Sequence, residues 1–159
     1  MIFYMIAREE HKAMASSETA IANLLYRYAE LIDSGDFEGA AALFRNCRVI
    51  SHDGEGGEAM LLANWREKVR VYPEGTPRTK HVITNPIIEV DEAAGTATCR
   101  SYYTVMQLVA PKTIVPVICG RYHDEFERVD GAWRFSFRDY SLTDLPGDLS
   151  AHLTPAAGF

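Results

Sequence analysis

The stretch Tyr26–Phe44, "YRYAELIDSGDFEGAAALF", predicts two helices joined by a tight turn. From Ser17 to Asp33, apolar residues recur at helical spacing, which indicates a helix with a wide buried face. Those apolar positions are Ile21, Leu24, Leu25, Tyr28, Leu31 and Ile32. Ser34-Gly35 supplies the stop, and Asp36 fits the N-cap of a second helix that runs to Phe44. The sequence therefore predicts a helical hairpin near the start of the fold.

Asp33 closes the first helix at the edge of its apolar face. Partial burial removes water from a carboxylate, and the C-terminal end of a helix dipole repels negative charge. A charged Asp33 in that place would require a cationic or hydrogen-donating partner. The alternative is a solvated aspartate in the turn "DSGD", where aspartate is common.

Downstream of the hairpin the pattern changes from helical to β. A short strand is expected at "CRVISH" (residues 47–52), and a third helix at about Glu58–Val71. Four longer β stretches follow, at about residues 81–90, 97–109, 114–128 and 132–142, separated by short turns. Helices followed by a meander of strands indicate an α+β fold, with one twisted, mainly antiparallel sheet that curls around the helices.

Length and composition bound the classes of protein that this chain can be. A chain of 159 residues has room for one domain with one core. We expect a leader over residues 1–15, whose apolar "MIFYMIA" is too short for a signal or membrane segment, and a single domain over residues 16–159. The net charge of −6 and the lack of a Lys/Arg cluster argue against nucleic acid and anionic membrane surfaces as partners.

The three cysteines, Cys47, Cys99 and Cys119, show no CxxC spacing and are expected to be reduced thiols of a cytoplasmic protein. Cys119 and His123 are four residues apart, but no third ligand is evident, so no metal site is predicted.

His81 is the candidate partner for Asp33. In "HVITNPIIEV", residues His81, Ile83 and Asn85 share one face of a strand by alternation. A histidine on the concave face of a curled sheet could meet an aspartate from the covering helix, and such a pair suits a general base near neutral pH. The alternative is a strand-end histidine whose ring nitrogens form hydrogen bonds with backbone groups.

Tyr28 lies five residues before Asp33, about 140° away around the helix. Its phenol could still reach the same cavity and polarise a carbonyl or protonate a leaving hydroxyl. The alternative is aromatic packing in the core.

Two later strands offer further candidates. In "GRYHDEFE" one row holds Tyr122, Asp124 and Phe126, and the other holds Arg121 and His123. The tyrosine and phenylalanine row is expected to face the cavity or core. In "WRFSF" the same rule predicts that Trp133, Phe135 and Phe137 all point into the core.

The segments "YRYAELIDSGDFEGAAALF", "HVITNPIIEV" and "GRYHDEFERVDGAWRFSFRDY" together resemble the SnoaL-like branch of the NTF2-like superfamily, over about Ser17 to Leu153. The resemblance implies a cone in which three N-terminal helices pack against a strongly curved, mostly antiparallel mixed sheet around an apolar pocket. The tail "DLPGDLSAHLTPAAGF" would cover this cone or touch a neighbouring subunit.

Within this branch the chain looks most similar to enzymes such as scytalone dehydratase, lindane dehydrochlorinase and bile-acid 7α-dehydratase. By motif position, the Asp-His dyad of those enzymes falls on Asp33 and His81, and the tyrosine of the bile-acid enzyme falls on Tyr28. A second histidine of scytalone dehydratase is matched loosely by His123, and an arginine of other relatives by Arg121 or Arg138. We expect the substrate to contact Trp65, Asn85, Tyr103, Tyr122, His123 and Arg121.

The resemblance implies a cofactor-independent lyase or isomerase. Its substrate would be a hydrophobic, oxygenated aromatic, polyketide or steroid-like molecule, and the protein would be a homodimer or homotrimer. The alternatives are a non-catalytic cone that binds a small ligand, or a structural subunit like the β subunit of a ring-hydroxylating dioxygenase. An epoxide hydrolase is not favoured, because no Asp-Arg-Asp arrangement is present.

Overall fold

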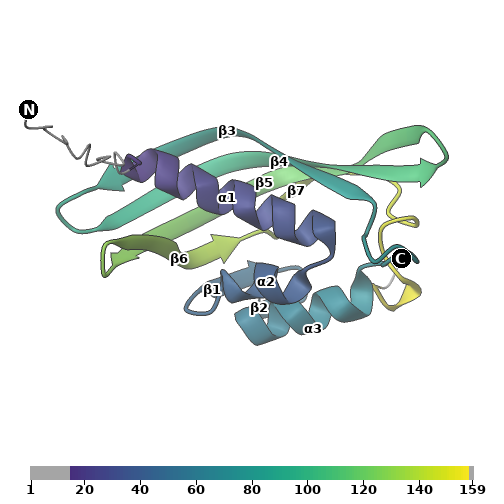
Figure 1. The fold of residues 1–159 in the computed structure, drawn as a ribbon, viewed down its shortest axis with the longest axis horizontal. Helices are drawn as coiled ribbons and strands as arrows, with labels where there is room; N and C mark the ends of the chain where they lie inside the picture. The colour runs from purple at the N-terminus through teal and green to yellow at the C-terminus, as the bar shows by residue number, and fades with distance from the viewer. Residues whose placement is uncertain (1–14, 158–159) are drawn as a thin grey trace, which may run out of the picture.

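The computed structural model of the chain describes residues 15–157. Residues 1–14 of the expected leader and the last two residues lie outside this range. Three α-helices precede the long strands: α1 (Ser17–Ser34), α2 (Phe37–Ala42) and α3 (Glu58–Lys68). Figure 1 shows α1 lying across one face of the sheet, with α2 and α3 beside its lower end. The predicted α+β order is confirmed.

The sheet has seven strands in the order β2-β1-β6-β5-β4-β3, and β7 pairs with β5 off this path. All pairings are antiparallel except the parallel one between β1 and β6, so the sheet is mixed and mostly antiparallel, as predicted. The strands are β1 (Arg48–Ser51), β2 (Gly54–Gly56), β3 (Thr79–Asp91), β4 (Thr96–Ala110), β5 (Thr113–Val129), β6 (Ala132–Asp139) and β7 (Thr143–Pro146). A short 3-10 turn, η1 (Pro155–Ala157), follows.

The turn between α1 and α2 depends on Gly35. Its φ of 82° is left-handed, and a Cβ there would collide with the carbonyl oxygen of Gly75, in the loop before β3. The amide of Gly39 donates to Asp36 Oδ1 at 2.8 Å and so caps α2. This turn fixes the end of α1, and Asp33 with it, against the start of β3.

The core lies between α1, α2, α3 and the inner face of the sheet. Phe44 contacts Phe135, and Phe126 contacts Phe135, with ring centroids 4.8 Å apart in each pair. Cys47 and Cys99 are buried, Cys119 is half-buried, and all three are free thiols. No helix within residues 15–157 is long and apolar enough to cross a membrane.

A bulge in β6 corrects the prediction that Phe137 lies in the core. Glu125 pairs with Phe137 and the next residue, Phe126, pairs with Phe135, so Ser136 is an extra residue. The alternation shifts by one after it: Phe135 is buried, Phe137 turns to the outer face under the guanidinium of Arg48, and Arg138 turns inward.

Arg138 forms a buried ion pair with Asp124. Its Nε donates to Asp124 Oδ1 at 2.7 Å and its Nη2 donates to Oδ2 at 2.8 Å, and the two residues are only 1% and 2% exposed. Burial disfavours the charge of Arg138, but Asp124 raises the pKa of the guanidinium, which stays charged. In this bidentate geometry, two N–H groups of the planar guanidinium each face one oxygen of the carboxylate.

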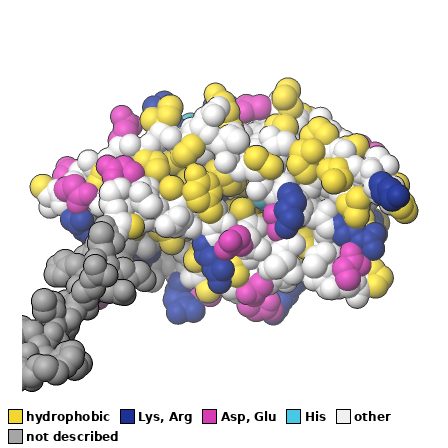
Figure 2. Space-filling model, turned by 45° about the horizontal axis from the view of Figure 1, so that its top comes forward, with side chains coloured by type: hydrophobic (Ala, Val, Ile, Leu, Met, Phe, Trp, Pro, Cys, Tyr) yellow, Lys and Arg dark blue, Asp and Glu magenta, His cyan; other side chains and the backbone are white. Residues whose placement is uncertain are grey.

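The outer face of the sheet carries exposed apolar side chains among charged ones. Those on β3 and β4 are Val82, Ile87 and Tyr102, which are 43%, 53% and 53% exposed. Figure 2 shows hydrophobic side chains gathered on the face turned to the viewer, with charged side chains around them.

We predict that Asp124→Ala lowers the free energy of unfolding by about 3 to 5 kcal/mol, because it leaves a charged arginine buried without its partner. The matched control is Asp144→Ala, which breaks the exposed bidentate pair with Arg121 and should cost less than about 1 kcal/mol. Urea unfolding of both variants measures the difference, and equal losses would contradict it.

Candidate active site

The end of α1 and the start of β3 bring Asp33 and His81 together. His81 Nδ1 lies 2.7 Å from Asp33 Oδ1, and the two side chains are only 8% and 5% exposed. The two side chains therefore contact each other, as predicted.

Asp33 receives two more hydrogen bonds from β3. The His81 amide donates to Oδ2 at 2.8 Å, and the Thr79 hydroxyl donates to Oδ1 at 2.7 Å. Burial alone would raise the pKa of Asp33, but the hydrogen bonds and charge of His81 and the Thr79 hydroxyl lower it. An ionised carboxylate is an acceptor only, so Nδ1 of His81 must carry the proton that Asp33 accepts, and Nε2 is the ring nitrogen that can take up a further proton.

His81 stands at the wall of a cavity of about 600 Å³. Four predicted site residues line this cavity together with His81: Tyr28, Trp65, Tyr103 and Tyr122. Asp33 lies behind His81 rather than on the wall. A volume of this size and a largely apolar and aromatic lining suit a small organic molecule.

Tyr28 lies beside the dyad. Its ring centroid is 6.0 Å from that of His81 in an edge-on arrangement, and 6.1 Å from that of Tyr122. The guanidinium of Arg138 lies 4.8 Å from the Tyr28 ring and 4.2 Å from the Tyr122 ring. Burial raises the pKa of Tyr28, while the Arg138 charge and a hydrogen bond with Tyr122 oppose this, so the phenol keeps its proton at neutral pH.

Three predicted contact residues lie away from the cavity wall. Arg121 and His123 point to the outer face of β5, opposite Tyr122, and Arg121 is bound to Asp144. Asn85 sits in a bulge of β3 with a φ of 52° and is exposed, because two residues there face one residue of β4. The structure thus corrects the placement of these three residues.

Several cavity residues were missed by sequence reasoning. Tyr140 follows β6, and Leu149, His152 and Leu153 come from the tail, which covers the cavity as one of the two outcomes predicted for it. The exposed side chains His52 and Asp53 mark where the cavity meets solvent. The tail has no periodic pattern that could have pointed to His152; its only signal was a histidine among apolar residues in "AHL".

His152 is a third histidine on the cavity wall, after His81 and His52. Burial, and then the nearby charge of His81, lower its pKa to about 4, with Asp33 opposing, so the ring is neutral near pH 7. Its Nδ1 is shielded from solvent and has no hydrogen-bond partner within residues 15–157. In the same part of the chain, no group of three His, Cys, Asp or Glu side chains is arranged to hold a metal ion.

Comparison with known proteins gives a family and a set of similar folds. A family model described as a SnoaL-like domain matches residues 13–139. No curated protein matches the sequence.

Three similar solved structures come from Novosphingobium aromaticivorans. An NTF2-like protein with a cystatin-like fold is 23% identical, with a TM-score of 0.64 over 84% of this chain and 85% of that one. A candidate scytalone dehydratase is 24% identical, with a TM-score of 0.62 over 82% of this chain and 86% of that one. The β subunit of a candidate aromatic-ring-hydroxylating dioxygenase is 19% identical, with a TM-score of 0.60 over 84% and 94%. At these identities the likeness concerns the fold, which is NTF2-like as predicted.

We predict that His152 makes the protein less stable in mild acid. In the unfolded chain His152 binds a proton near pH 6.5, whereas in the folded chain it does so only near pH 4. Between these values the unfolded state holds more protons, so the free energy of unfolding falls as the pH is lowered, by about 3 kcal/mol at most from this group.

Urea unfolding between pH 7.5 and pH 4.5 (about the range of this titration) measures the effect. His152→Gln should weaken the pH dependence of the free energy of unfolding. The control His123→Gln, on the outer face of β5, should leave this pH dependence close to that of the wild type. Parallel curves for the wild type and His152→Gln would contradict the prediction.

Proposed function

Because the chain belongs to the SnoaL-like domain family, we propose that it is a lyase or isomerase that removes a proton from carbon in a hydrophobic, oxygenated small molecule. The observation that carries this proposal is the buried Asp33–His81 pair at the wall of an apolar cavity. An imidazole held in one tautomer by a carboxylate is a suitable general base near neutral pH.

In the proposed reaction, Nε2 of His81 takes the proton from a carbon next to a carbonyl group. Asp33 stays ionised and stabilises the imidazolium that forms. The electron pair of the broken C–H bond moves onto the carbonyl as an enolate, which the Tyr28 hydroxyl stabilises by donating a hydrogen bond.

In a dehydration, the enolate then expels a hydroxyl group from the next carbon. The C–O bond breaks, a C=C bond forms, and the leaving hydroxyl takes the proton from His81 to become water. In an isomerisation, the proton returns to a different carbon. Neither course requires a redox cofactor, since no electrons are gained or lost overall.

The substrate must activate the C–H bond itself. A positioned acid or base contributes on the order of 10² to 10⁴ in rate, which suffices for a carbon next to a carbonyl group. The aromatic and aliphatic lining of the cavity supports an aromatic, polyketide or steroid-like ring system, whose flat apolar faces would lie against Trp65 and Tyr103.

A non-catalytic cone or dioxygenase-type subunit is the alternative. The likeness to a dioxygenase β subunit supports it at the level of the fold. A carboxylate buried at a helix end costs stability, however, and a purely structural subunit has no use for one aimed at a cavity histidine. We therefore prefer the enzyme.

A homodimer or homotrimer in the cytoplasm stays a prediction. The exposed apolar side chains on β3 and β4 (Val82, Ile87 and Tyr102) form the surface that a second copy would cover. Light scattering of the purified chain would test the oligomeric state, and the mass of a single chain would contradict it.

We predict that His81→Ala lowers the turnover of β-hydroxy ketones and hydroxysteroids by a factor of about 10² to 10⁴. Appearance of the conjugated product, followed by its ultraviolet absorbance, is the measurement. Asp33→Asn should also reduce turnover, because an amide can no longer stabilise the imidazolium.

The matched control is His123→Ala, which removes a histidine from the outer face of β5 and should retain wild-type turnover. Equal turnover by the wild type and His81→Ala would remove His81 as the base. If neither the wild type nor His81→Ala turns over substrate, and a dioxygenase catalytic chain co-purifies, the structural-subunit alternative would be favoured.

A further inference from the structure

We propose that His152 forms a second polar contact for the ligand, so that the natural ligand carries two uncharged oxygen functions, one facing His81 and Tyr28 and the other facing His152. This inference deepens the proposed function and rests on it for the identity of the reacting oxygen. The second contact itself is a matter of binding and can be tested without turnover.

The backbone around His152 is fixed on both sides. The amide of Arg70 donates to the His152 carbonyl at 2.9 Å, and the amide of Thr154 donates to the Lys68 carbonyl at 2.8 Å. Further back, the amide of Gly147 donates to the Val117 carbonyl at 2.9 Å. We call residues 147–157 the strap; these bonds tie it to α3, to the segment after α3 and to β5.

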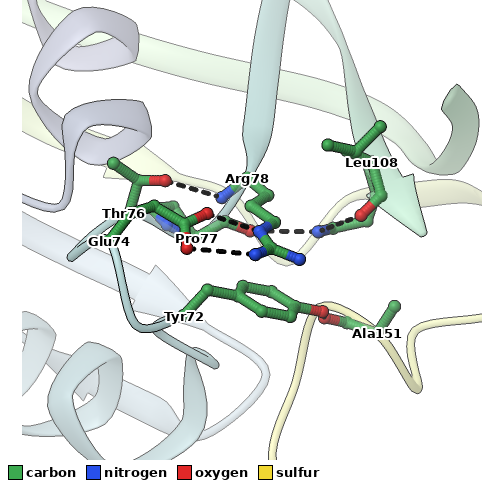
Figure 3. Close-up of polar contacts among 8 residues, drawn as sticks. Tyr72, Glu74, Thr76, Pro77, Arg78, Leu108 and Ala151 are labelled. Atoms are coloured by element: carbon green, nitrogen blue, oxygen red, sulfur yellow. Dashed lines mark hydrogen bonds and ion pairs between the residues drawn. The ribbon is translucent and has the colours of Figure 1, made fainter. Parts of the chain in front are cut away.

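Side chains of the loop before β3 hold the strap as well. Figure 3 shows the ring of Tyr72 reaching the strap, where its hydroxyl donates to the Ala151 carbonyl at 2.7 Å. The guanidinium of Arg78 stacks 4.1 Å from the centroid of the Tyr72 ring and is held by Glu74. The residue next to His152 is therefore anchored by a stacked aromatic ring, which keeps the histidine at the cavity wall.

The imidazole of His152, in contrast, is not engaged by the protein. Its Nδ1 is enclosed by protein atoms and has no hydrogen-bond partner in the part of the chain that the structure describes, so a ligand oxygen in the cavity would bond to Nε2. A shielded polar atom without a partner typically costs about 1 to 3 kcal/mol. A firmly held backbone with an unused polar ring is the arrangement expected of a ligand contact.

The surroundings of His152 select an uncharged oxygen. Leu149, Leu153 and Val69 line the same cavity as His152, and the imidazole of His152 is neutral near pH 7. Lys68, the cation among the lining residues, is already paired with Asp53, so a ligand carboxylate beside His152 would be buried without a free cation, at a large cost in hydration. A hydroxyl group can both donate and accept, so it can satisfy either tautomer of a neutral imidazole.

The test uses β-naphthol and the isomeric dihydroxynaphthalenes as probes, in which a second hydroxyl lies at different distances from the first. Isothermal titration calorimetry of the full chain at neutral pH gives the dissociation constants. We expect at least one dihydroxynaphthalene to bind the wild type about fivefold to tenfold more tightly than β-naphthol, which corresponds to one net hydrogen bond.

In His152→Phe this preference should vanish while the affinity for β-naphthol stays within about twofold, which is well below the energy of one hydrogen bond; unchanged β-naphthol binding also shows that the cavity is intact. His152→Gln, which retains a donor and an acceptor, should restore part of the preference. His123→Phe, on the outer face of β5, should leave it unchanged.

The inference is overturned if no dihydroxynaphthalene binds the wild type more tightly than β-naphthol, or if the preference persists in His152→Phe. Failure of the proposed function would appear differently. If His81→Ala turns over substrate as fast as the wild type, but the hydroxyl preference still depends on His152, then the cavity binds a two-oxygen ligand without the proposed chemistry.

Discussion

The site depends on the hydrogen bonds that the carboxylate of Asp33 accepts. It accepts hydrogen bonds from the Thr79 hydroxyl, the His81 amide and the His81 ring, so one side chain joins the end of α1 to the start of β3. Its unfavourable position at the negative end of a helix dipole is offset by these three donors. Because the backbone and the ring of the same histidine are bound, the orientation of the imidazole is determined by the packing of helix on sheet.

This arrangement divides the cavity into regions with different chemistry. Next to His81 lies the phenol of Tyr28, which keeps its proton, and the positive charge of Arg138 lies 4.8 Å from the Tyr28 ring. Arg138 is held by Asp124, so its charge acts on the tyrosine rings without being available to a ligand carboxylate. The remaining wall is largely apolar, and its tail offers the neutral imidazole of His152. Other polar side chains also line the cavity, namely His52, Asp53, Asn64, Lys68, Tyr140 and Thr143.

Much of the fold was predictable because its signals are local. Helical spacing, the Gly35 stop and the short turns between strands placed the helices and the longer strands within a few residues of their observed bounds. The short strands β2 and β7 were not predicted. The pairing of Asp33 with His81 was also predictable, since a carboxylate at a buried helix end demands a donor. The placements of Asn85 and Phe137 were wrong because each depends on a bulge, and alternation along a strand cannot be continued through an inserted residue. His152 lies on a tail held by long-range hydrogen bonds, for which no local pattern exists.

The bulge at Ser136 has a consequence for how this site can change over evolution. Ser136 contributes no functional group to the dyad or to the ion pair, yet its bulge decides that arginine rather than phenylalanine faces inward after it. A strand that ran through Ser136 without the bulge would place the Phe137 ring inside, near Tyr28, and the Arg138 cation in solvent. Deleting Ser136, in contrast, would remove the bulge and leave Phe137 outside and Arg138 inside. The electrostatics of the pocket therefore depend on the register of β6 as well as on its side chains, so a change that regularised the bulge while keeping Ser136 would alter them more than most substitutions.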